Sequence, residues 1–466
     1  MSNAGILDSI PTWFWGTFSQ ASYVNLSHNH IHSKLVTTIR NPLSTKIVDL
    51  STNHLCGKLP YLSRNVKWLD ISSNSFSGPM NDFLCNKQFE QFGLNLLNLA
   101  SNNLSGKIPD CWIKWPNLMD VNLQSNNFVG NLPPSMGSLA ILKSCNIRNN
   151  SLSGTFPVFL KNNNELISLD LGKNNYSGEI PTWIGERLLN IKILRLRSNK
   201  FSGHIPNEIC DMIFLQDLDL AQNSLSGNIP SCFNHISAMF QKNKSTDLFI
   251  YSEEDFYMGH SSAISIFLGI KRSVLEYKSI LGLVTNIDLS NNNLSGGIPT
   301  EITYLDGLIY LKLSKNQLTG QIPPSAGNMR SLESMDISKN QLSGEIPPTI
   351  ANLSFLNELD VSYNHLKGQI PTGTQIQSFE ASNFVGNNLC GPPLPINCSF
   401  NKQISSVKRI RTEDDGHEVN WFFVSMTLGF VVVFCIVVAP LFIYKSWRYV
   451  YFYFLDDMLY KMQSYW

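Results

Sequence analysis

The sequence predicts a solenoid, a curved stack of short coils with a parallel β-sheet along its concave face. Two recurring strings predict this fold. The string L-x-L-x-x-N, as in Leu169–Asn174 and Leu218–Asn223, closes 13 times on an asparagine when related apolar residues are allowed, and eight of the 12 spacings are 24 residues. The string Gly-x-(Ile/Leu/Phe)-Pro follows 11 of these asparagines. Chance does not produce such a period, so the repeat dictates the fold.

Each repeat position has a physical role. The two Leu of L-x-L point inward from a short strand, and the residue between them points outward. The closing Asn turns the chain out of the strand, and its amide can pair with the buried loop backbone of adjacent coils. Gly permits a tight turn, and Pro holds an extended path. A single coil cannot bury its own apolar edge, so the coils stack. We call the closing residues the ladder asparagines: Asn29, Asn53, Asn74, Asn102, Asn126, Asn150, Asn174, Asn199, Asn223, Asn292, Asn316, Asn340 and Asn364.

Composition narrows the function classes. The 466 residues include 57 Leu and 49 Asn, and Asn favours turns over helix and strand interiors. Hydrophobic residues make up 43% and charged residues only 15%, which argues against a disordered chain. Lys+Arg and Asp+Glu both number 35, so the net charge is zero and no basic field favours nucleic-acid binding.

With its consensus L-x-L-x-x-N-x-L-S-G-x-I-P, the sequence resembles the plant-specific leucine-rich repeat over roughly residues 10–372. The resemblance implies a leucine-rich-repeat solenoid of the α/β type, with a parallel sheet on the concave face and a plant-specific second sheet outside it. We expect leucine-rich repeats over 1–239, an island insertion over 240–281, the last four repeats over 282–372 and a C-terminal cap over 373–399.

One spacing breaks the period. Asn223 and Asn292 lie 69 residues apart, 45 more than one repeat. Long insertions in repeat arrays are often functional, although a disordered loop is the alternative. The junction at 271–290 resembles that of the island domain in plant receptor-like proteins, which precedes a last block of about four repeats.

The C-terminal part predicts a membrane anchor. The stretch 383–398 resembles the family's cap, which implies a Cys390–Cys398 disulfide. An acidic juxtamembrane linker over 400–420 precedes 24 uncharged residues, Trp421–Tyr444. As a helix this run reaches about 36 Å, enough to cross a bilayer core. Basic residues follow it, which favours a cytoplasmic tail over 445–466, too short for a kinase. Ser425 and Gly429, four residues apart, could let a partner helix approach closely.

Cysteines and sequons indicate an extracellular location. Cys85 and Cys111 stand at +11 and +9 from their ladder asparagines, as do Cys210 and Cys232. Because both pairs repeat the same two offsets in adjacent coils, we expect Cys85–Cys111 and Cys210–Cys232 disulfides, with free buried thiols as the alternative; zinc ligands are spaced differently. Cys56, Cys145 and Cys435 look unpaired. Glycosylation sequons begin at Asn25, Asn103, Asn149, Asn175, Asn243, Asn293, Asn352 and Asn397.

The N-terminal residues 1–18 contain no secretory signal and read as the middle of a repeat, without the family's N-terminal cap. We therefore expect the C-terminal part of a longer receptor, or a truncated gene model. The location expected from the resemblance is the plasma membrane, as a single-pass type I protein with its N-terminus outside, provided that the full-length form carries a signal peptide.

No pattern indicates enzyme activity. The chain has no Gly-rich phosphate loop, H-E-x-x-H or G-x-S-x-G motif. The run Glu253-Glu254-Asp255 fits a solvated loop, and His28, His30 and His32 alternate without an evident closing metal ligand. We expect no enzyme activity, no cofactor and no metal.

The whole-chain resemblance implies a kinase-less receptor-like protein of the disease-resistance or elicitor-receptor kind. It would bind an extracellular peptide or protein and signal through adaptor and co-receptor receptor-like kinases. It would not bind nucleic acid. An apoplastic inhibitor of cell-wall hydrolases and a non-functional or decoy fragment are the alternatives; the island and the membrane span favour the receptor. Candidate ligand- or partner-binding residues are outward positions of the repeats: Arg148, Arg195, Arg197, Asp217, Tyr310, Lys312, Lys315, Lys339 and Tyr363.

Overall fold

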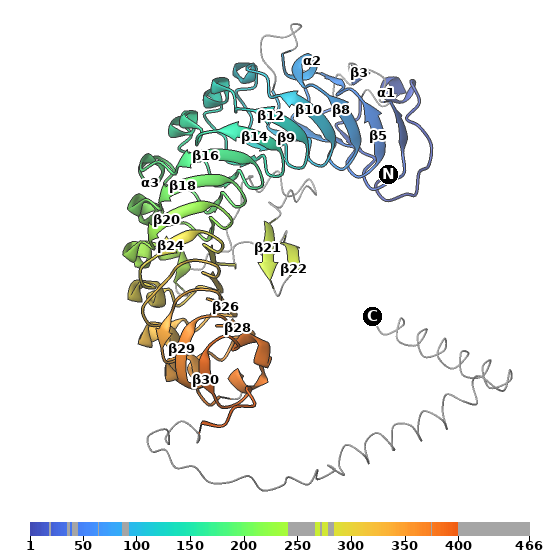
Figure 1. The fold of residues 1–466 in the computed structure, drawn as a ribbon. Coiled ribbons are helices and arrows are strands. Elements are labelled where there is room, and N and C mark those ends of the chain that lie inside the picture. The colour runs from blue at the N-terminus through green and yellow to red at the C-terminus, as the bar shows by residue number, and fades with distance from the viewer. Residues whose placement is uncertain are drawn as a thin grey trace, which may run out of the picture. The chain divides into compact units, whose positions relative to one another are not determined.

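The computed structural model describes residues 1–17, 20–34, 38–39, 45–63, 65–85, 93–240, 266–270, 273–277, 284–373 and 375–398. Residues 1–400 make up one compact unit. Within it the coils stack into a curved array, and the strands of successive coils lie side by side (Figure 1). The predicted leucine-rich-repeat solenoid with parallel sheets is therefore confirmed.

A parallel sheet of 13 strands runs through all the coils. Each strand pairs with the next at the same repeat position, so that Leu169 of one coil lies opposite Leu194 of the next and Leu194 lies opposite Leu218. These three central Leu are fully buried. In order, the strands are β1 (Tyr23–Asn25), β4 (Ile47–Asp49), β7 (Trp68–Asp70), β9 (Leu96–Asn98), β11 (Asp120–Asn122), β13 (Ser144–Asn146), β15 (Ser168–Asp170), β17 (Ile193–Arg195), β19 (Asp217–Asp219), β23 (Asn286–Asp288), β25 (Tyr310–Lys312), β26 (Ser334–Asp336) and β28 (Glu358–Asp360).

A second parallel sheet follows the ladder asparagines, as the Ser-Gly-x-Ile-Pro stretch implied. It has ten strands: β2 (His32–Lys34), β5 (His54–Gly57), β8 (Ser75–Gly78), β10 (Asn103–Lys107), β12 (Asn127–Gly130), β14 (Ser151–Gly154), β16 (Asn175–Glu179), β18 (Lys200–His204), β20 (Ser224–Asn228) and β24 (Asn293–Ser295). A three-stranded sheet of β27 (Ser343–Gly344), β29 (His365–Gln369) and β30 (Asn388–Cys390) occupies the same position in the last coils. A further parallel pair joins β3 (Thr38–Ile39) to β6 (Tyr61–Leu62).

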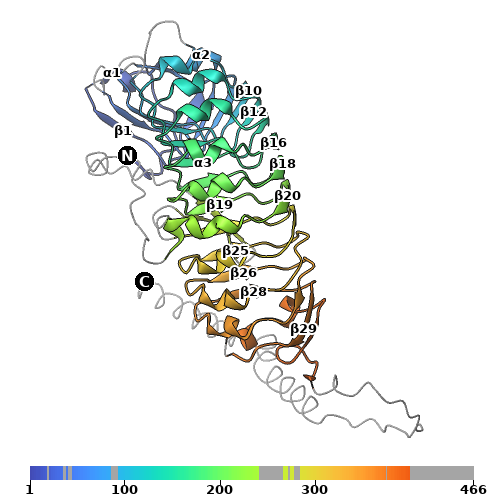
Figure 2. The same cartoon turned by 90° about the vertical axis from the view of Figure 1, so that its left-hand side faces the viewer.

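Short helices run along the convex side (Figure 2). Half of those in the described residues are five-residue 3₁₀ turns that start directly after the Pro of Gly-x-(Ile/Leu/Phe)-Pro. Runs of 3₁₀ helix are usually this short. The α-helices are α1 (Phe14–Thr17), α2 (Asn81–Leu84) and α3 (Trp183–Arg187). The 3₁₀ turns are η1 (Trp112–Lys114), η2 (Pro134–Ser138), η3 (Val158–Asn162), η4 (Asn207–Asp211), η5 (Ser231–His235), η6 (Ser237–Met239), η9 (Thr300–Tyr304), η10 (Pro324–Asn328), η11 (Pro348–Asn352), η12 (Ile376–Ser378) and η13 (Ala381–Asn383).

The ladder asparagines join adjacent coils as predicted. Asn174 shows the pattern: its Nδ2 donates to the carbonyl oxygens of Ile147 and Leu171, both at 3.0 Å. Its Oδ1 accepts the backbone N–H of Leu152 at 3.0 Å. One buried amide therefore bonds backbone groups of two coils, and each of the two carbonyls also accepts from the ladder asparagine of a neighbouring coil, Asn150 or Asn199.

The solenoid continues across the island insertion. Strand β19 pairs in register with β23, although 66 residues of the sequence lie between Asp219 and Asn286. Asn292 completes the ladder, since its Nδ2 donates to the Leu220 carbonyl and its Oδ1 accepts the Leu225 N–H, both at 3.0 Å. Within the insertion, β21 (Ile266–Ile270) and β22 (Ser273–Tyr277) form an antiparallel hairpin. The insertion thus leaves the main array unbroken.

The cap contains a ladder asparagine that the sequence count missed. The Oδ1 of Asn387 accepts the Leu366 N–H at 3.0 Å, and its Nδ2 donates to the Val361 carbonyl at 2.9 Å. Its sequence signal is the string Asn387-Asn388-Leu389, which matches Asn-x-Leu, 23 residues after Asn364. The cap therefore extends the polar ladder over the last coil while covering its apolar edge.

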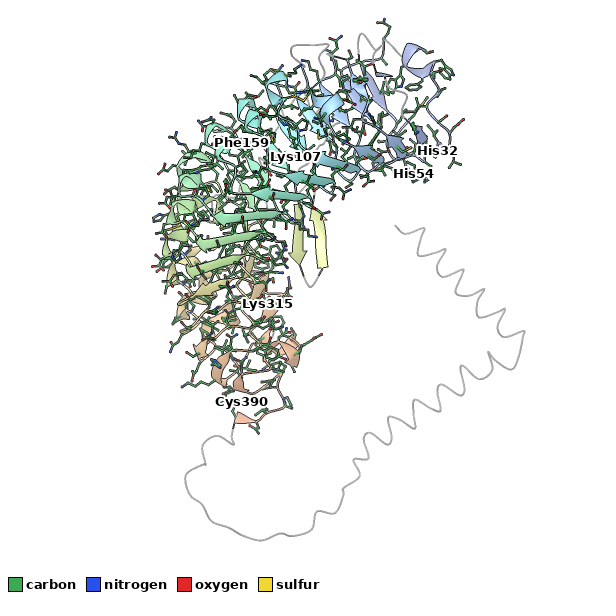
Figure 3. The ribbon with its side chains drawn as sticks, turned by 45° about the horizontal axis from the view of Figure 1, so that its top comes forward. His32, His54, Lys107, Phe159, Lys315 and Cys390 are labelled. Atoms are coloured by element: carbon green, nitrogen blue, oxygen red, sulfur yellow. A yellow bond between two sulfur atoms is a disulfide. The ribbon has the colours of Figure 1, made fainter. Side chains whose placement is uncertain are left out.

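Three disulfides are present in the described part of the chain, Cys85–Cys111, Cys210–Cys232 and Cys390–Cys398. They are the three pairs that the sequence analysis proposed; Cys390 is labelled in Figure 3. Cys56 and Cys145 have free thiols. Burial raises the pKa of the Cys145 thiol to about 12, so this core cysteine stays protonated and unreactive.

Candidate ligand-binding surfaces

The outward side chains of β15, β17 and β19 form a buried ionic network. The Nε of Arg195 donates to Asp217 Oδ2 at 2.7 Å. On the other side Asp170 lies 4.0 Å from Arg195 and 3.9 Å from Arg148. The Asn286 Nδ2 donates to the remaining Asp217 oxygen at 2.8 Å. Opposite charges thus alternate from coil to coil.

A second network lies beside it. Arg197 donates to Asp288 Oδ2 at 2.7 Å and lies 3.4 Å from Asp219 Oδ1. Burial, together with repulsion from the Asp288 carboxylate, raises the pKa of Asp219 to about 7. The Arg197 charge opposes that shift without cancelling it. Asp219 is therefore protonated more easily than an exposed aspartate.

These networks bury three of the predicted ligand-binding residues and pair their charges within the protein. Only 2% of Arg195 and 1% of Asp217 is exposed, and Arg148 is 8% exposed. Their charges are compensated within the protein, because residues at one repeat position lie about 4.8 Å apart on adjacent strands. Arg197 keeps more exposure, with 24% of its side chain accessible. The structure thus brings Arg148, Arg195, Asp217 and Arg197 together in two adjacent ionic networks, where they pair with aspartates of neighbouring coils or, for Arg195 and Asp217, with each other.

The last four repeats present a different surface. Lys315, Lys339 and Tyr363 each precede a ladder asparagine, have a left-handed backbone with φ of 53–56°, and are exposed. The Nζ of Lys339 lies 5.8 Å from the centre of the Tyr363 ring, a cation–π contact. Lys315, labelled in Figure 3, occupies the same position one coil earlier. These residues form a basic and aromatic column, which we call the Lys–Tyr column.

Two neighbours of this column are less accessible than expected. The expectation of an accessible Tyr310 is wrong, because Tyr310 is 8% exposed and its hydroxyl donates to Glu333 at 3.3 Å. Lys312 is half-buried between Asp288 and Asp336, its register partners on the adjacent strands. Both residues belong to strand β25, where packing between coils covers the first outward position.

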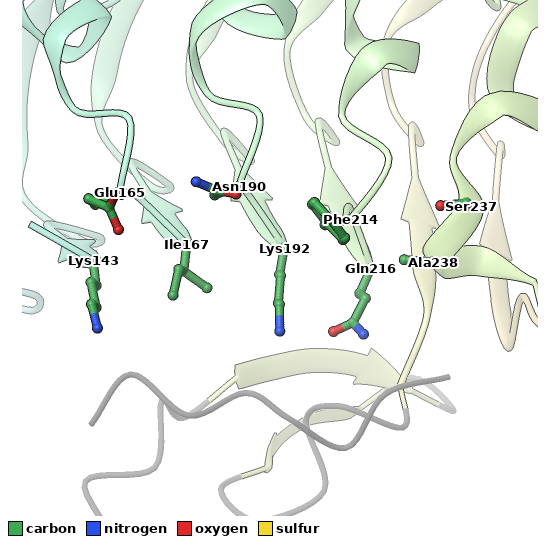
Figure 4. A pocket seen from close by; sticks show the side chains of 9 residues that line it. All are labelled: Lys143, Glu165, Ile167, Asn190, Lys192, Phe214, Gln216, Ser237 and Ala238. Carbon is green, nitrogen blue, oxygen red and sulfur yellow. The ribbon is translucent and has the colours of Figure 1, made fainter. Parts of the chain in front are cut away.

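A groove at the edge of the concave sheet was not predicted. Lys143, Ile167, Lys192 and Gln216 directly precede β13, β15, β17 and β19 and point the same way (Figure 4). A cavity of about 500 Å³ lies along them. We call it the edge groove; the remaining lining residues are Glu165, Asn190, Phe214, Ser237 and Ala238. The available signal was the common offset of the four residues from their ladder asparagines.

Histidines of the first coils lie close together on adjacent strands. The rings of His30 and His54 stack with their centres 5.7 Å apart, and His54 lies opposite His32 on the adjacent strand (Figure 3). Among the residues that the structure describes, no group of three or more His, Cys, Asp or Glu could hold a metal ion.

Several predictions concern residues outside the described ranges: the sequon at Asn243, the linker 400–420, the span 421–444 with Ser425 and Gly429, and the tail 445–466. Among the described residues, no helix is both long and apolar enough to cross a membrane. Of the sequon asparagines that are described, Asn25 is half-buried, and it accepts hydrogen bonds from Ser27. The other six are exposed: Asn103, Asn149, Asn175, Asn293, Asn352 and Asn397.

Comparison with known proteins agrees with the fold. Leucine rich repeat family models match residues 283–342, and residues 93–115, 190–212 and 214–236. The solved structure of the plant peptide hormone receptor RGFR1 in complex with RGF2 superposes with a TM-score of 0.64 at 26% identity, covering 82% of this chain and 54% of that chain.

Two curated relatives match nearly the whole chain. Receptor-like protein EIX2 of Solanum lycopersicum is 48% identical over 469 residues, 98% of this chain and 45% of the relative. Receptor-like protein EIX1 of the same plant is 46% identical over 470 residues, with the same coverage. The chain thus spans less than half the length of these relatives. From the repeat consensus, the two-sheet solenoid and this identity, the chain belongs to the plant leucine-rich-repeat receptor-like proteins.

Proposed function

We propose that this chain is part of a cell-surface receptor that binds an extracellular peptide or protein through its repeats and signals through a separate receptor kinase in plant defence. Two observations carry the proposal: the sequence identity to a receptor-like protein, which extends over 98% of the chain, and the continuous solenoid. Its rigid coils hold binding side chains at a regular spacing. The predicted span at 421–444 would anchor the chain in the plasma membrane, with the repeats outside and the tail of 22 residues in the cytoplasm.

The Lys–Tyr column is the proposed contact for a co-receptor kinase. Lys315, Lys339 and Tyr363 are exposed and combine positive charge with an aromatic ring. Aromatic and cationic side chains are frequent anchors in protein interfaces. The coils hold these side chains on a rigid backbone, so this protein loses less conformational entropy when a partner binds than a flexible loop would lose.

The test expresses the tagged 466-residue chain in leaves behind an added secretory signal peptide, because residues 1–18 contain none. It then applies elicitor preparations and measures the kinases that co-purify, together with the oxidative burst. We expect elicitor-dependent recovery of a kinase, and at least a fivefold loss with the double change Lys315→Glu and Lys339→Glu. The matched control is Lys367→Glu, an exposed lysine on β29. Kinase recovery that does not depend on the elicitor, or that survives the double change, would count against this assignment.

The same experiment separates the alternatives. An inhibitor would lower cell-wall hydrolase activity without any kinase. A decoy would bind the elicitor and weaken the response of a co-expressed intact receptor. The membrane helix is tested separately with Gly429→Leu, which we expect to reduce adaptor-kinase recovery because a bulky residue keeps helices apart. Unchanged recovery would assign recruitment to the repeats.

A further inference from the structure

The edge groove has a rigid floor. The carbonyl oxygens of Lys143, Ile167 and Lys192 each accept two backbone N–H groups from the following coil, at 2.8–3.1 Å. The Gln216 carbonyl accepts the Asn286 N–H at 2.8 Å, so the pattern continues past the insertion. The four side chains therefore project from fixed positions, and a ligand would bind them with little cost for ordering the protein.

Gln216 points to a missing hydrogen-bond donor. The residue is 3% exposed, and within the described structure its Oε1 has no hydrogen-bond partner. Leaving a buried acceptor unpaired costs roughly 1–3 kcal/mol, and buried polar atoms in folded proteins are nearly always paired. A bound molecule that donates an N–H or O–H to the Oε1 of Gln216 would remove this cost.

Charge and spacing narrow the class of ligand. Lys143 and Lys192 lie two strands apart in the same row, about 9–10 Å at the usual strand spacing. In a polyproline II helix, residues three apart share a face and are separated by about 9.3 Å. In an extended strand, same-face residues are only about 6.7 Å apart. Carboxylates three residues apart on a polyproline II peptide therefore match the two lysines.

The other lining groups suit the same ligand. Phe214, 46% exposed, and the half-buried Ile167 provide apolar contacts for proline rings. The backbone N–H groups of a polyproline II peptide form no internal hydrogen bonds, so one is available for Gln216. Glu165 also lines the groove, above the row in Figure 4, so the described lining residues carry a net charge of about +1 with the two lysines.

We propose that the edge groove binds an extracellular peptide in the polyproline II conformation, with carboxylates three residues apart over Lys143 and Lys192 and a backbone N–H donated to Gln216 Oε1. This inference rests on the proposed receptor function, and it names the chemistry of one ligand class. Lys143 and Lys192 also interact with other groups of the protein. The carboxylates of the peptide would add to these interactions and need not replace them.

The experiment measures fluorescence anisotropy with the full chain in detergent. The labelled probe is Pro-Glu-Pro-Pro-Glu-Ala-Ala-Pro, and the matched control is Pro-Glu-Pro-Glu-Pro-Ala-Ala-Pro, which has the same composition with the two Glu two residues apart. We expect the probe to bind at least tenfold more tightly. Equal affinities would overturn the spacing argument and the proposal. Stronger binding of a uronic-acid oligosaccharide than of the probe would assign the groove to a glycan instead.

Variants test the named contacts. Gln216→Met should weaken probe binding about fivefold without lowering the thermal midpoint, because the lost acceptor has no partner in the fold. Lys192→Glu should weaken it more than tenfold, and Phe214→Ala, a change at an exposed position, about threefold. Gln317→Met and Lys200→Glu, both at exposed positions outside the groove, are the controls.

Unchanged binding by the three groove variants would refute the site. The outcome is separable from that of the receptor proposal, since binding is measured without any kinase. Probe binding without kinase recruitment in leaves would contradict the signalling role alone, and elicitor-dependent recruitment without probe binding would contradict the groove alone.

Discussion

Asn292→Ala should uncouple the repeats before the insertion from those after it. Asn292 is the first ladder asparagine after the insertion and is 7% exposed. Its Oδ1 accepts the Leu225 N–H, and its Nδ2 donates to the carbonyls of Leu220 and Leu289, at 3.0–3.1 Å. The first two bonds cross the junction, so the substitution leaves the Leu225 N–H unpaired and removes one of two donors from the Leu220 carbonyl, which keeps the Asn223 amide at 3.0 Å.

The magnitude follows from these contacts. The unpaired Leu225 N–H costs roughly 1–3 kcal/mol, and each bond lost from a carbonyl that keeps another donor, as Leu220 and Leu289 do, costs about 0.5–1.5 kcal/mol. We therefore expect a loss of about 2–5 kcal/mol. In a repeat array this loss acts on one interface between nearest neighbours. We therefore expect local opening near the junction rather than uniform weakening of the solenoid.

Native-state hydrogen exchange measures this locally, which matters because a long array need not unfold in two states. Amides of 218–228 and 286–295 should exchange at least tenfold faster in the variant, while those of 96–130 keep their rates. Gln317→Ala, exposed and next to a ladder asparagine, is the control. Parental exchange rates at the junction would refute the reasoning that this amide joins the two blocks.

Three further changes test separate features. Folding raises the pKa of Asp219 from 3.8 to about 7. Between these pH values the folded protein binds one more proton than the unfolded chain, so the contribution of this carboxyl to stability falls as the pH rises from about 4 to 7. Asp219→Asn should flatten that slope in urea unfolding at pH 5 and pH 7.5, and an unchanged slope would contradict the buried-charge argument. Gly185→Ala places a Cβ 1.6 Å from a backbone oxygen of the next coil and should cost at least about 2 kcal/mol by thermal unfolding, whereas at Gly16 a Cβ meets no atom within 4 Å and the same change should be neutral. Replacing Cys210 and Cys232 by Ser opens a loop of sequence separation 22 and should cost about 3 kcal/mol in non-reducing urea unfolding; equal midpoints with and without the bond would show that it adds no stability.

The fold could be predicted because each of its instructions is local and repeated. A strand of three residues, its ladder asparagine and the following Gly-x-Ile-Pro lie within one coil, and stacking adds only translation by one period. The disulfide pairs of the flank were predictable for the same reason, since Cys210 and Cys232 stand in adjacent coils at the same two offsets, +11 and +9, as Cys85 and Cys111 do. Asn387 was missed because the cap keeps its ladder position without the L-x-L string before it.

Which outward side chains face solvent was decided by the tertiary structure. Arg195, Asp217 and Tyr310 occupy outward repeat positions, yet they are buried because the facing residues of neighbouring coils complete their ion pairs and hydrogen bonds. Gln216 has the opposite outcome, a buried amide whose oxygen has no hydrogen-bond partner in the described part of the chain. The period of the sequence determines where a side chain starts and which way it points. Its exposure depends on what the adjacent coil places about 4.8 Å away, and that depends on the pairing of individual side chains, which the repeat leaves variable.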